Sequence, residues 1–320
     1  MNSQLGKWDC SQQALWMDED LPATDDLWSL TVLSFGGGQD TSALLCRLCF
    51  DEGFRQQYAP GRLLAVMSDT GDEHRHTYAW LRHIRDFCRQ QGVEFHFLTA
   101  RSGWHSDAWR TLHTQWSRNQ TVGMKAGMKS CTDNLKIKPF YRFLAEWVRR
   151  EMGMPYSGTE SLVRFARRYG KIRVLIGFTK GEEGRIADPQ TWRDKWRRNA
   201  ITQLYPLIDE GWTRQDCIDY LRSIGQPVPN PSNCRNCPYS SKTDLLWLWR
   251  NERPAYERWV QAEAAKLTKF KHLGSRNNTV WGKKTLPEIL SEAQTEFGHL
   301  TDEDLNRLKL THGHCVASKF

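Results

Sequence analysis

Hydrophobic residues occur in this chain in two patterns, as short continuous runs and as longer segments with helical spacing. The short runs cover residues 27–35, 62–69, 93–99 and 171–178, and the last two contain single polar residues. Runs this short and this apolar predict strands that are buried on both faces. Segments with apolar residues three or four positions apart predict helices, and they cover residues 41–50, 77–92, 105–116, 138–153, 159–169 and 213–225.

Strands that alternate with helices in this way predict an α/β fold, with a parallel sheet covered by helices on both faces. After about Tyr205 the pattern changes to helices and one loop rich in Pro and Asn. We therefore expect an N-terminal extension at 1–28, an α/β domain at 29–210 and a mostly helical C-terminal region at 211–320.

Composition narrows the class of protein. The 320 residues include 45 Lys and Arg against 37 Asp and Glu, and 39% are hydrophobic, which excludes a disordered or fibrous chain. No apolar run approaches the ~20 residues of a membrane helix, and the N-terminus does not resemble a signal peptide. We expect a cytoplasmic protein without a membrane partner. Nine cysteines in such a chain favour metal, cluster or redox chemistry over a disulfide framework.

The strongest candidate for chemistry is a glycine-rich segment between the first predicted strand and the first predicted helix. Its glycines allow a tight turn that points backbone N–H groups at one spot, and the helix N-terminus adds partial positive charge there. Asp40 could bind Mg²⁺. No Gly-Lys-Ser/Thr follows, so this is not a Walker loop. The segment comprises Ser34, Phe35, Gly36, Gly37, Gly38, Gln39, Asp40, Thr41 and Ser42.

This segment resembles the pyrophosphate loop, Ser-Gly-Gly-x-Asp-Ser, of the N-type ATP pyrophosphatases, the PP-loop superfamily. Five further elements resemble its sulfate-adenylyl reductase-like branch, in the same order along residues 30–262. They are Ser68–Glu73 with Thr77 and Tyr78, Cys131-Thr132 with Lys136 and Pro139, Ile176-Gly177 through Glu182 and Arg185, Tyr205–Ile208, and Pro229–Cys237. Two positions depart from the pattern. Gly36 replaces the usual Ser, and Gln39 replaces a frequent Lys, which removes a charge near the β- and γ-phosphates.

The resemblance implies an adenine nucleotide alpha-hydrolase-like fold, related to the Rossmann fold, that binds ATP and Mg²⁺. It assigns catalytic roles to Asp40, Cys131 and Arg185. Asp69 ends a predicted strand, where open α/β sheets bind ligands, although a turn residue is the alternative there, as an ordinary surface cation is for Arg185. The implied nucleotide-binding residues are Ser34, Gly36, Gly37, Gly38, Gln39, Asp40, Thr41, Ser42, Asp69, Thr70, Gly177 and Glu182.

The cysteines divide into packing residues and candidate ligands. Cys234 and Cys237 form a Cys-x-x-Cys pair that suits zinc, an iron–sulfur cluster or a redox pair. In the resembling families the position of Cys131 faces the active site, so the three cysteines together could hold a 4Fe–4S cluster. Zinc, no metal at all, and a redox or persulfide pair stay open as alternatives. We interpret four cysteines on helix faces as core residues: Cys46, Cys49, Cys88 and Cys217.

Positive charge concentrates between Arg149 and Arg198, where 13 Lys and Arg face 6 Asp and Glu. Within it, residues 192–198 alternate Trp with cations, a pattern that suits phosphate contacts and base stacking. The alternative is a solvated helix face with tryptophans in the core. We therefore expect a nucleic-acid partner, and the family resemblance strengthens that expectation.

The leading hypothesis is an ATP pyrophosphatase that adenylates a nucleic-acid acceptor for sulfur insertion, with a cysteine desulfurase as sulfur donor. The chain resembles the ATP pyrophosphatase component of DNA phosphorothioation systems, a form of anti-phage defence, which favours DNA over tRNA. A homodimer is compatible with this hypothesis. The alternatives are a tRNA thiolation enzyme, a reductase of adenylyl sulfate or its 3′-phosphate, and a subunit that senses nucleotides without turnover. The reductase uses a C-terminal Glu-Cys-Gly-Leu-His motif, and the tail here has only Gly313-His314-Cys315.

Overall fold

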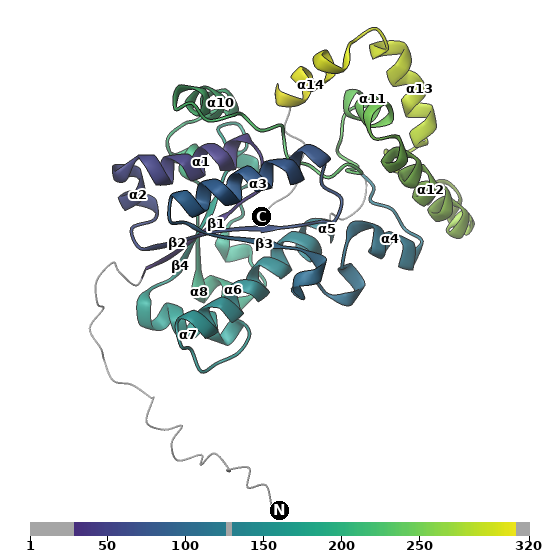
Figure 1. The fold of residues 1–320 in the computed structure, drawn as a ribbon. Helices are drawn as coiled ribbons and strands as arrows, with labels where there is room; N and C mark the ends of the chain where they lie inside the picture. Colours follow the sequence, from purple (N-terminus) through teal and green to yellow (C-terminus); the bar gives the residue numbers. More distant parts are fainter. Residues whose placement is uncertain (1–28, 126–129, 312–320) are drawn as a thin grey trace, which may run out of the picture.

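A five-stranded parallel sheet forms the centre of the α/β part of the molecule (Figure 1). The computed structural model describes residues 29–125 and 130–311, so the predicted extension 1–28 and Cys315 lie outside the described residues. The strand order is β3-β2-β1-β4-β5, and every neighbouring pair is parallel. This confirms the predicted α/β class. The strands are β1 Leu30–Ser34, β2 Arg62–Ser68, β3 Glu94–Leu98, β4 Ile172–Ile176 and β5 Ile201–Leu204.

Alternate residues of the strands enter two separate cores, one on each face of the sheet. Val32 belongs to the core beneath α6 (Lys138–Glu151), α7 (Thr159–Tyr169) and α8 (Lys195–Ala200). Its neighbour Leu33 belongs to the opposite core. That second core is covered by α1 (Gln39–Phe50), α2 (Glu52–Tyr58), α3 (Arg75–Gln90) and α10 (Arg214–Ser223) (Figure 1).

A third core lies in the C-terminal helices, at one end of the sheet (Figure 1). The fully buried Trp259 is at its centre. Trp116, from the segment after β3, also packs into this core and joins the two parts of the molecule. The helices that build it are α4 (Leu112–Asn119), α11 (Lys242–Asn251), α12 (Arg253–Lys269), α13 (Leu286–Phe297) and α14 (Asp302–Thr311).

Several short helical turns connect the main elements. Cys131 belongs to α5 (Ser130–Thr132), which continues through a π-helical turn at Asp133–Ile137 into α6. The remaining short α-helix is α9 (Pro206–Asp209). In the described ranges, no helix is long and apolar enough to cross a membrane.

One element of the structure was not predicted from the sequence, and the role of several cysteines becomes clear. The short strand β5 was not predicted, because its four residues follow a basic helix without an apolar run. Helix α10 packs on α1, and its Cys217 belongs to the sheet core together with Cys46 and Cys88, which confirms these cysteines as packing residues. The expected boundary near residue 210 stays a prediction.

Candidate functional site

A pocket opens at the carboxyl ends of the strands, where the strand order reverses. The chain moves outward from β1 through β2 to β3 and then crosses to β4 on the other side of β1. In sheets of this kind, the loops after the two strands at the reversal diverge and leave a crevice for ligands. Here the pocket is lined by the glycine-rich loop after β1 and by Gly177 and Phe178 after β4.

The glycine-rich loop has the backbone geometry that its sequence predicts. Gly37 has a φ of +79°, and a Cβ atom there would lie 3.3 Å from the side chains of Met67 and Thr77. The hydroxyl of Thr41 closes the turn, because it accepts a hydrogen bond from the N–H of Gly36 at 3.3 Å and donates one to the carbonyl of Gly38 at 3.3 Å. Helix α1 begins directly afterwards, so its N-terminus lies beside the pocket.

Gly177 is explained by the close approach of α1 to the end of β4. A Cβ atom at Gly177 would lie 2.8 Å from Cγ2 of Thr41 and 3.3 Å from its backbone N. Any side chain there would push the start of α1 away from the sheet. The loop after β1 and the loop after β4 therefore pack directly against each other beside the pocket.

Three cations line the pocket, and each is paired with a carboxylate. Arg214 of α10 contacts Asp40, with Nη2 at 3.1 Å from Oδ2. Arg185 contacts Glu182 at 2.6 Å, and its guanidinium lies 3.9 Å from the ring centre of Phe178. Lys136 lies 3.6 Å from Glu73, which is buried behind the pocket. Burial raises the pKa of Asp40, and Arg214 acts in the opposite direction.

Most of the predicted nucleotide-binding residues line this pocket. Gly37, Ser42, Asp69 and Thr70 are outside the lining formed by the described residues. The hydroxyl of Ser42 accepts a hydrogen bond from Trp80 at 3.2 Å inside the core. Arg185, which was predicted as a catalytic residue, also lines the pocket. The lining residues from the predicted nucleotide-binding set are Ser34, Gly36, Gly38, Gln39, Asp40, Thr41, Gly177 and Glu182.

Asp69 and Thr70 shape the turn that follows β2. Asp69 accepts hydrogen bonds from the N–H of Gly71 and the hydroxyl of Tyr78, both at 2.8 Å. The hydroxyl of Thr70 donates to Glu73 at 3.0 Å. These contacts correspond to the turn-residue interpretation of Asp69, since both hydrogen bonds to its Oδ1 hold the loop.

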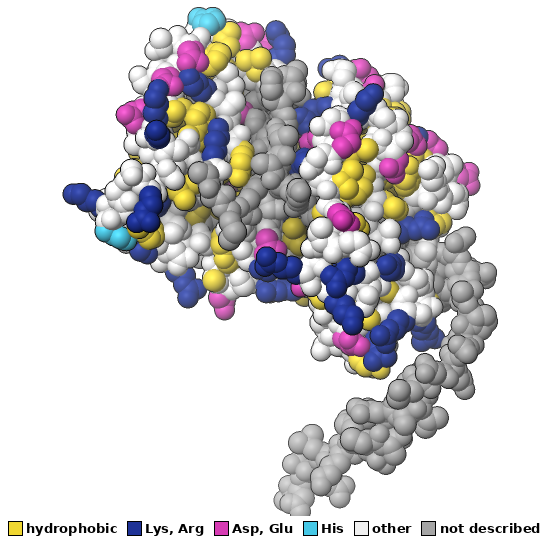
Figure 2. Space-filling model, turned by 180° about the vertical axis from the view of Figure 1, so that it is seen from behind, with side chains coloured by type: hydrophobic (Ala, Val, Ile, Leu, Met, Phe, Trp, Pro, Cys, Tyr) yellow, Lys and Arg dark blue, Asp and Glu magenta, His cyan; other side chains and the backbone are white. Residues whose placement is uncertain are grey.

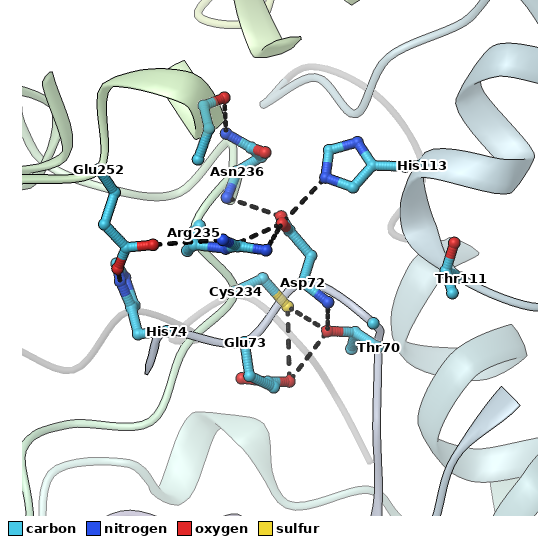
Figure 3. A network of polar contacts seen from close by, with 12 residues as sticks. Thr70, Asp72, Glu73, His74, Thr111, His113, Cys234, Arg235, Asn236 and Glu252 are labelled. Atoms are coloured by element: carbon cyan, nitrogen blue, oxygen red, sulfur yellow. Dashed lines mark hydrogen bonds and ion pairs between the residues drawn. The ribbon is translucent and has the colours of Figure 1, made fainter. Parts of the chain in front are cut away.

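The Cys-x-x-Cys loop is fixed to this turn by the two residues between its cysteines (Figure 3). The carboxylate of Asp72 is fully buried, and it accepts hydrogen bonds from Arg235 at 3.2 Å and from the backbone N–H of Asn236 at 3.0 Å. His113 lies 2.9 Å from the same carboxylate. Arg235 also reaches Glu252 at 3.2 Å, at the junction of α11 and α12. The loop thus joins the α/β sheet to the C-terminal helices.

The structure does not assemble the three predicted ligand cysteines into a metal site. Cys234 donates a hydrogen bond to Thr70 at 3.2 Å and lies 3.8 Å from the carboxylate of Glu73. Burial and then Glu73 raise the pKa of this thiol well above its usual value. Cys131 packs against the core of the C-terminal helices. Among the described residues, no group of three His, Cys, Asp or Glu side chains is placed to hold a metal ion. The 4Fe–4S cluster stays a prediction.

The tryptophans of residues 192–198 were expected to stack on bases, and the structure corrects this expectation. Trp192 and Arg197 are buried, and the Arg197 guanidinium lies 4.3 Å from the ring centre of Trp192. Trp196 packs in the same core. Trp192 is therefore not available to stack on bases, and Trp196 is partly buried. Arg193 and Lys195 are the exposed cations of the segment.

Other exposed cations lie away from the pocket. Arg149 and Arg150 end α6, and Lys171 directly precedes β4. This is the amino-terminal edge of the sheet, since Trp147 of α6 contacts Glu94 at the start of β3. The pocket lies at the opposite, carboxyl-terminal edge. Figure 2 shows Lys and Arg side chains spread over the molecule among acidic ones, with several near the α6–α7 side.

Arg214 is a charged residue of the pocket lining that was not predicted from the sequence. It directly follows Thr213, the N-cap of α10, and so lies in the first helical turn. That position favours acidic residues because of the helix dipole. An arginine in the first turn of a predicted helix therefore indicated an acidic partner in another part of the chain.

Comparisons with known proteins leave the family open. No family model matches the sequence, and no curated protein matches it. Among solved structures, the chain is similar to the U34-tRNA thiolase NcsA from Methanococcus maripaludis, described with its 4Fe–4S cluster. The identity is 12% and the TM-score 0.38, over 87% of this chain and 77% of that one. A similarity this low gives no basis for assigning an activity. The fold and pocket define the chain as a parallel α/β protein with a pocket at the reversal of strand order.

Proposed function

We propose that this chain is an ATP-dependent enzyme that transfers AMP to a nucleic-acid acceptor and releases pyrophosphate. The observation that supports the proposal is the pocket at the β1–β4 reversal. It combines a glycine-rich turn, the N-terminus of α1 and three cations from separate elements. Backbone N–H groups and a helix N-terminus bind phosphate, and Arg side chains add charge-assisted hydrogen bonds.

The pocket also fits a magnesium ion bound with the nucleotide. Asp40 and Glu182 are carboxylates that line it, and Mg²⁺ prefers oxygen ligands from one or two carboxylates together with substrate phosphates. When bound, the ion would neutralise phosphate charge. Asp40 and Glu182 would hold it, while Lys136 and Arg185 would face the phosphate oxygens.

In this reaction an oxygen of the acceptor attacks the α-phosphorus of ATP. A bond forms between that oxygen and the α-phosphorus, and the bond from the α-phosphorus to the oxygen bridging to the β-phosphorus breaks. Pyrophosphate leaves with the electron pair, and the pocket cations stabilise its charge. AMP then remains on the acceptor as a leaving group.

We further propose that the terminal sulfur of a persulfide from a cysteine desulfurase bonds to the activated atom of the acceptor, with the DNA backbone as the acceptor. The bond from that atom to the oxygen of AMP breaks, and AMP leaves with the electron pair. A second thiol then cleaves the remaining S–S bond, so that the sulfur stays on the acceptor and a disulfide forms. This part rests on the resemblance of the sequence motifs to PP-loop enzymes. A tRNA base is the alternative acceptor, and a cytoplasmic homodimer is the form in which we expect the enzyme to act.

The test uses ATP labelled at the α- or γ-phosphate, incubated with the purified chain and either duplex DNA or tRNA. We expect labelled pyrophosphate from γ-labelled ATP and α-label on the DNA, which addition of a sulfur donor should release as AMP. Asp40→Asn should reduce pyrophosphate release by at least 100-fold, because it removes a carboxylate from the pocket. Asp219→Asn, on the exposed face of α10, is the matched control. Release of ADP and orthophosphate would refute the reaction, and label on tRNA alone would refute DNA as the acceptor.

A further inference from the structure

Arg214 reaches the glycine-rich loop from a distant part of the chain. It is the first residue of α10, and its partner Asp40 lies in the first turn of α1, 174 positions earlier. Nε and Nη2 of the guanidinium lie 3.3 and 3.1 Å from the same carboxylate oxygen. The side chain keeps 20% of its surface exposed, and it lines the pocket.

The position of this guanidinium is electrostatically unfavourable without an anion. It lies in the first turn of α10 and contacts the first turn of α1, and both helix N-termini carry partial positive charge. Burial acts to lower the pKa of Arg214, but Asp40 outweighs it and raises the pKa, so the group stays charged. Asp216 lies in the first turn of α10 and Glu182 also acts on Arg214, so the cations and carboxylates of the site balance in number. The N-terminus of α1 adds partial positive charge at the pocket.

The loop itself supplies no cation. From Ser34 to Ser42 it contains neither Lys nor Arg, and Gln39, at the start of α1, is neutral. A polyphosphate held against this loop by backbone N–H groups would carry several negative charges. Those charges need side chains from other elements, and Arg214 is the cation already in contact with the loop.

We propose that Arg214 is a phosphate-binding residue of the nucleotide site, and that it exchanges Asp40 for the β- and γ-phosphate oxygens when ATP binds. The inference rests on the proposed function and names the group that selects a polyphosphate. A planar guanidinium that already contacts a carboxylate through two nitrogens can bind two phosphate oxygens in the same way. Release from Arg214 leaves the carboxylate of Asp40 available to the magnesium ion.

The experiment compares the binding of ATP, AMP and inorganic tripolyphosphate by calorimetry. Arg214→Met should weaken ATP and tripolyphosphate binding by 10- to 100-fold and change AMP binding less than 2-fold, because AMP lacks the β- and γ-phosphates. Arg222→Met, on the exposed face of the same helix, should leave all three unchanged. Gln39→Lys, added to Arg214→Met, should restore at least part of the lost tripolyphosphate affinity, since it returns a positive charge to the loop.

Four outcomes would overturn the inference. Equal loss of ATP and AMP binding in Arg214→Met would mean that Arg214 only maintains the fold of the loop. A large fall in the melting temperature of both Arg214→Met and Arg214→Lys would mean the same. Unchanged tripolyphosphate binding in Arg214→Met would remove Arg214 from the site while leaving the proposed function intact. Absence of ATP and tripolyphosphate binding in the wild type would refute both.

Discussion

At the residue scale, Cys234 shows how surroundings determine the chemistry of a side chain. Reactive cysteines lie near cations or helix N-termini, which lower the thiol pKa. Cys234 is instead buried beside the carboxylate of Glu73, and both raise its pKa. The motif Cys-x-x-Cys alone could not distinguish these cases, because the carboxylate comes from the turn after β2.

We predict that Cys234 reacts slowly with iodoacetamide at pH 7.5, at least 10-fold more slowly than a free thiol, because only the thiolate is nucleophilic. Replacing the neighbouring carboxylate in Glu73→Gln should increase the rate, since it removes one cause of the raised pKa. Peptide mass spectrometry over a time course measures this. The exposed Glu52→Gln is the control, and alkylation of wild-type Cys234 at the rate of free cysteine would contradict the prediction.

At the scale of elements, the positions of four strands could be predicted from the sequence, but only part of the pocket at their carboxyl ends could be. Runs such as 62–69 are continuous because a parallel strand inside the sheet is buried on both faces, and the predicted runs match β1 to β4 in position. β3, at the edge of the sheet, is only partly buried over most of its length. β5 has an exposed Thr202 and no such run. The glycine-rich loop could be identified because its glycines are adjacent in sequence. Arg214 and the buried faces of Trp192 and Trp196 depend on tertiary packing, which no local pattern records.

The junction of α1 with β4 provides a test at this scale. Gly177→Ala should destabilise the protein by about 1–3 kcal/mol, the usual cost of overpacking, because the added methyl group would overlap Thr41. It should also weaken ATP binding, since the start of α1 must move. Chemical denaturation and calorimetry measure the two effects. Gly184→Ala, where an added Cβ meets nothing within 4 Å, should change neither, and a fully stable Gly177→Ala variant would disprove the close approach.

At the scale of the whole molecule, one buried ion-pair network connects the α/β sheet with the C-terminal helices. Glu252 accepts a hydrogen bond from Arg235 and lies 3.2 Å from His74 at the start of α3. Burial acts to raise the pKa of Glu252, but His74 and Arg235 outweigh it and lower the pKa to about 2. The carboxylate therefore stays ionised in the folded protein at pH values where it is protonated in the unfolded chain.

The network predicts an acid-sensitive stability. Because the folded pKa of Glu252 lies below its ordinary value of 4.5, its contribution is complete above pH 4.5 and is lost as the pH falls toward 2. The contribution is about 3 kcal/mol. Glu252→Gln should lower the free energy of unfolding at pH 7 and flatten its decline between pH 5 and 2, measured by urea denaturation. The exposed Glu257→Gln should retain the steep decline, and an unaltered profile in Glu252→Gln would contradict the role of this pair.

The separation of Asp40 and Arg214 along the chain also has a consequence for synthesis. The loop is complete when α1 has emerged, but its cation follows 174 residues later. At the usual rates of translation this interval is about 10–35 s. During that time the carboxylate of Asp40 has no arginine from α10, and the closing of so long a chain segment carries an entropic cost. Nascent chains that stop before α10 should therefore leave the loop without its arginine partner, and the complete pocket arises only late in synthesis.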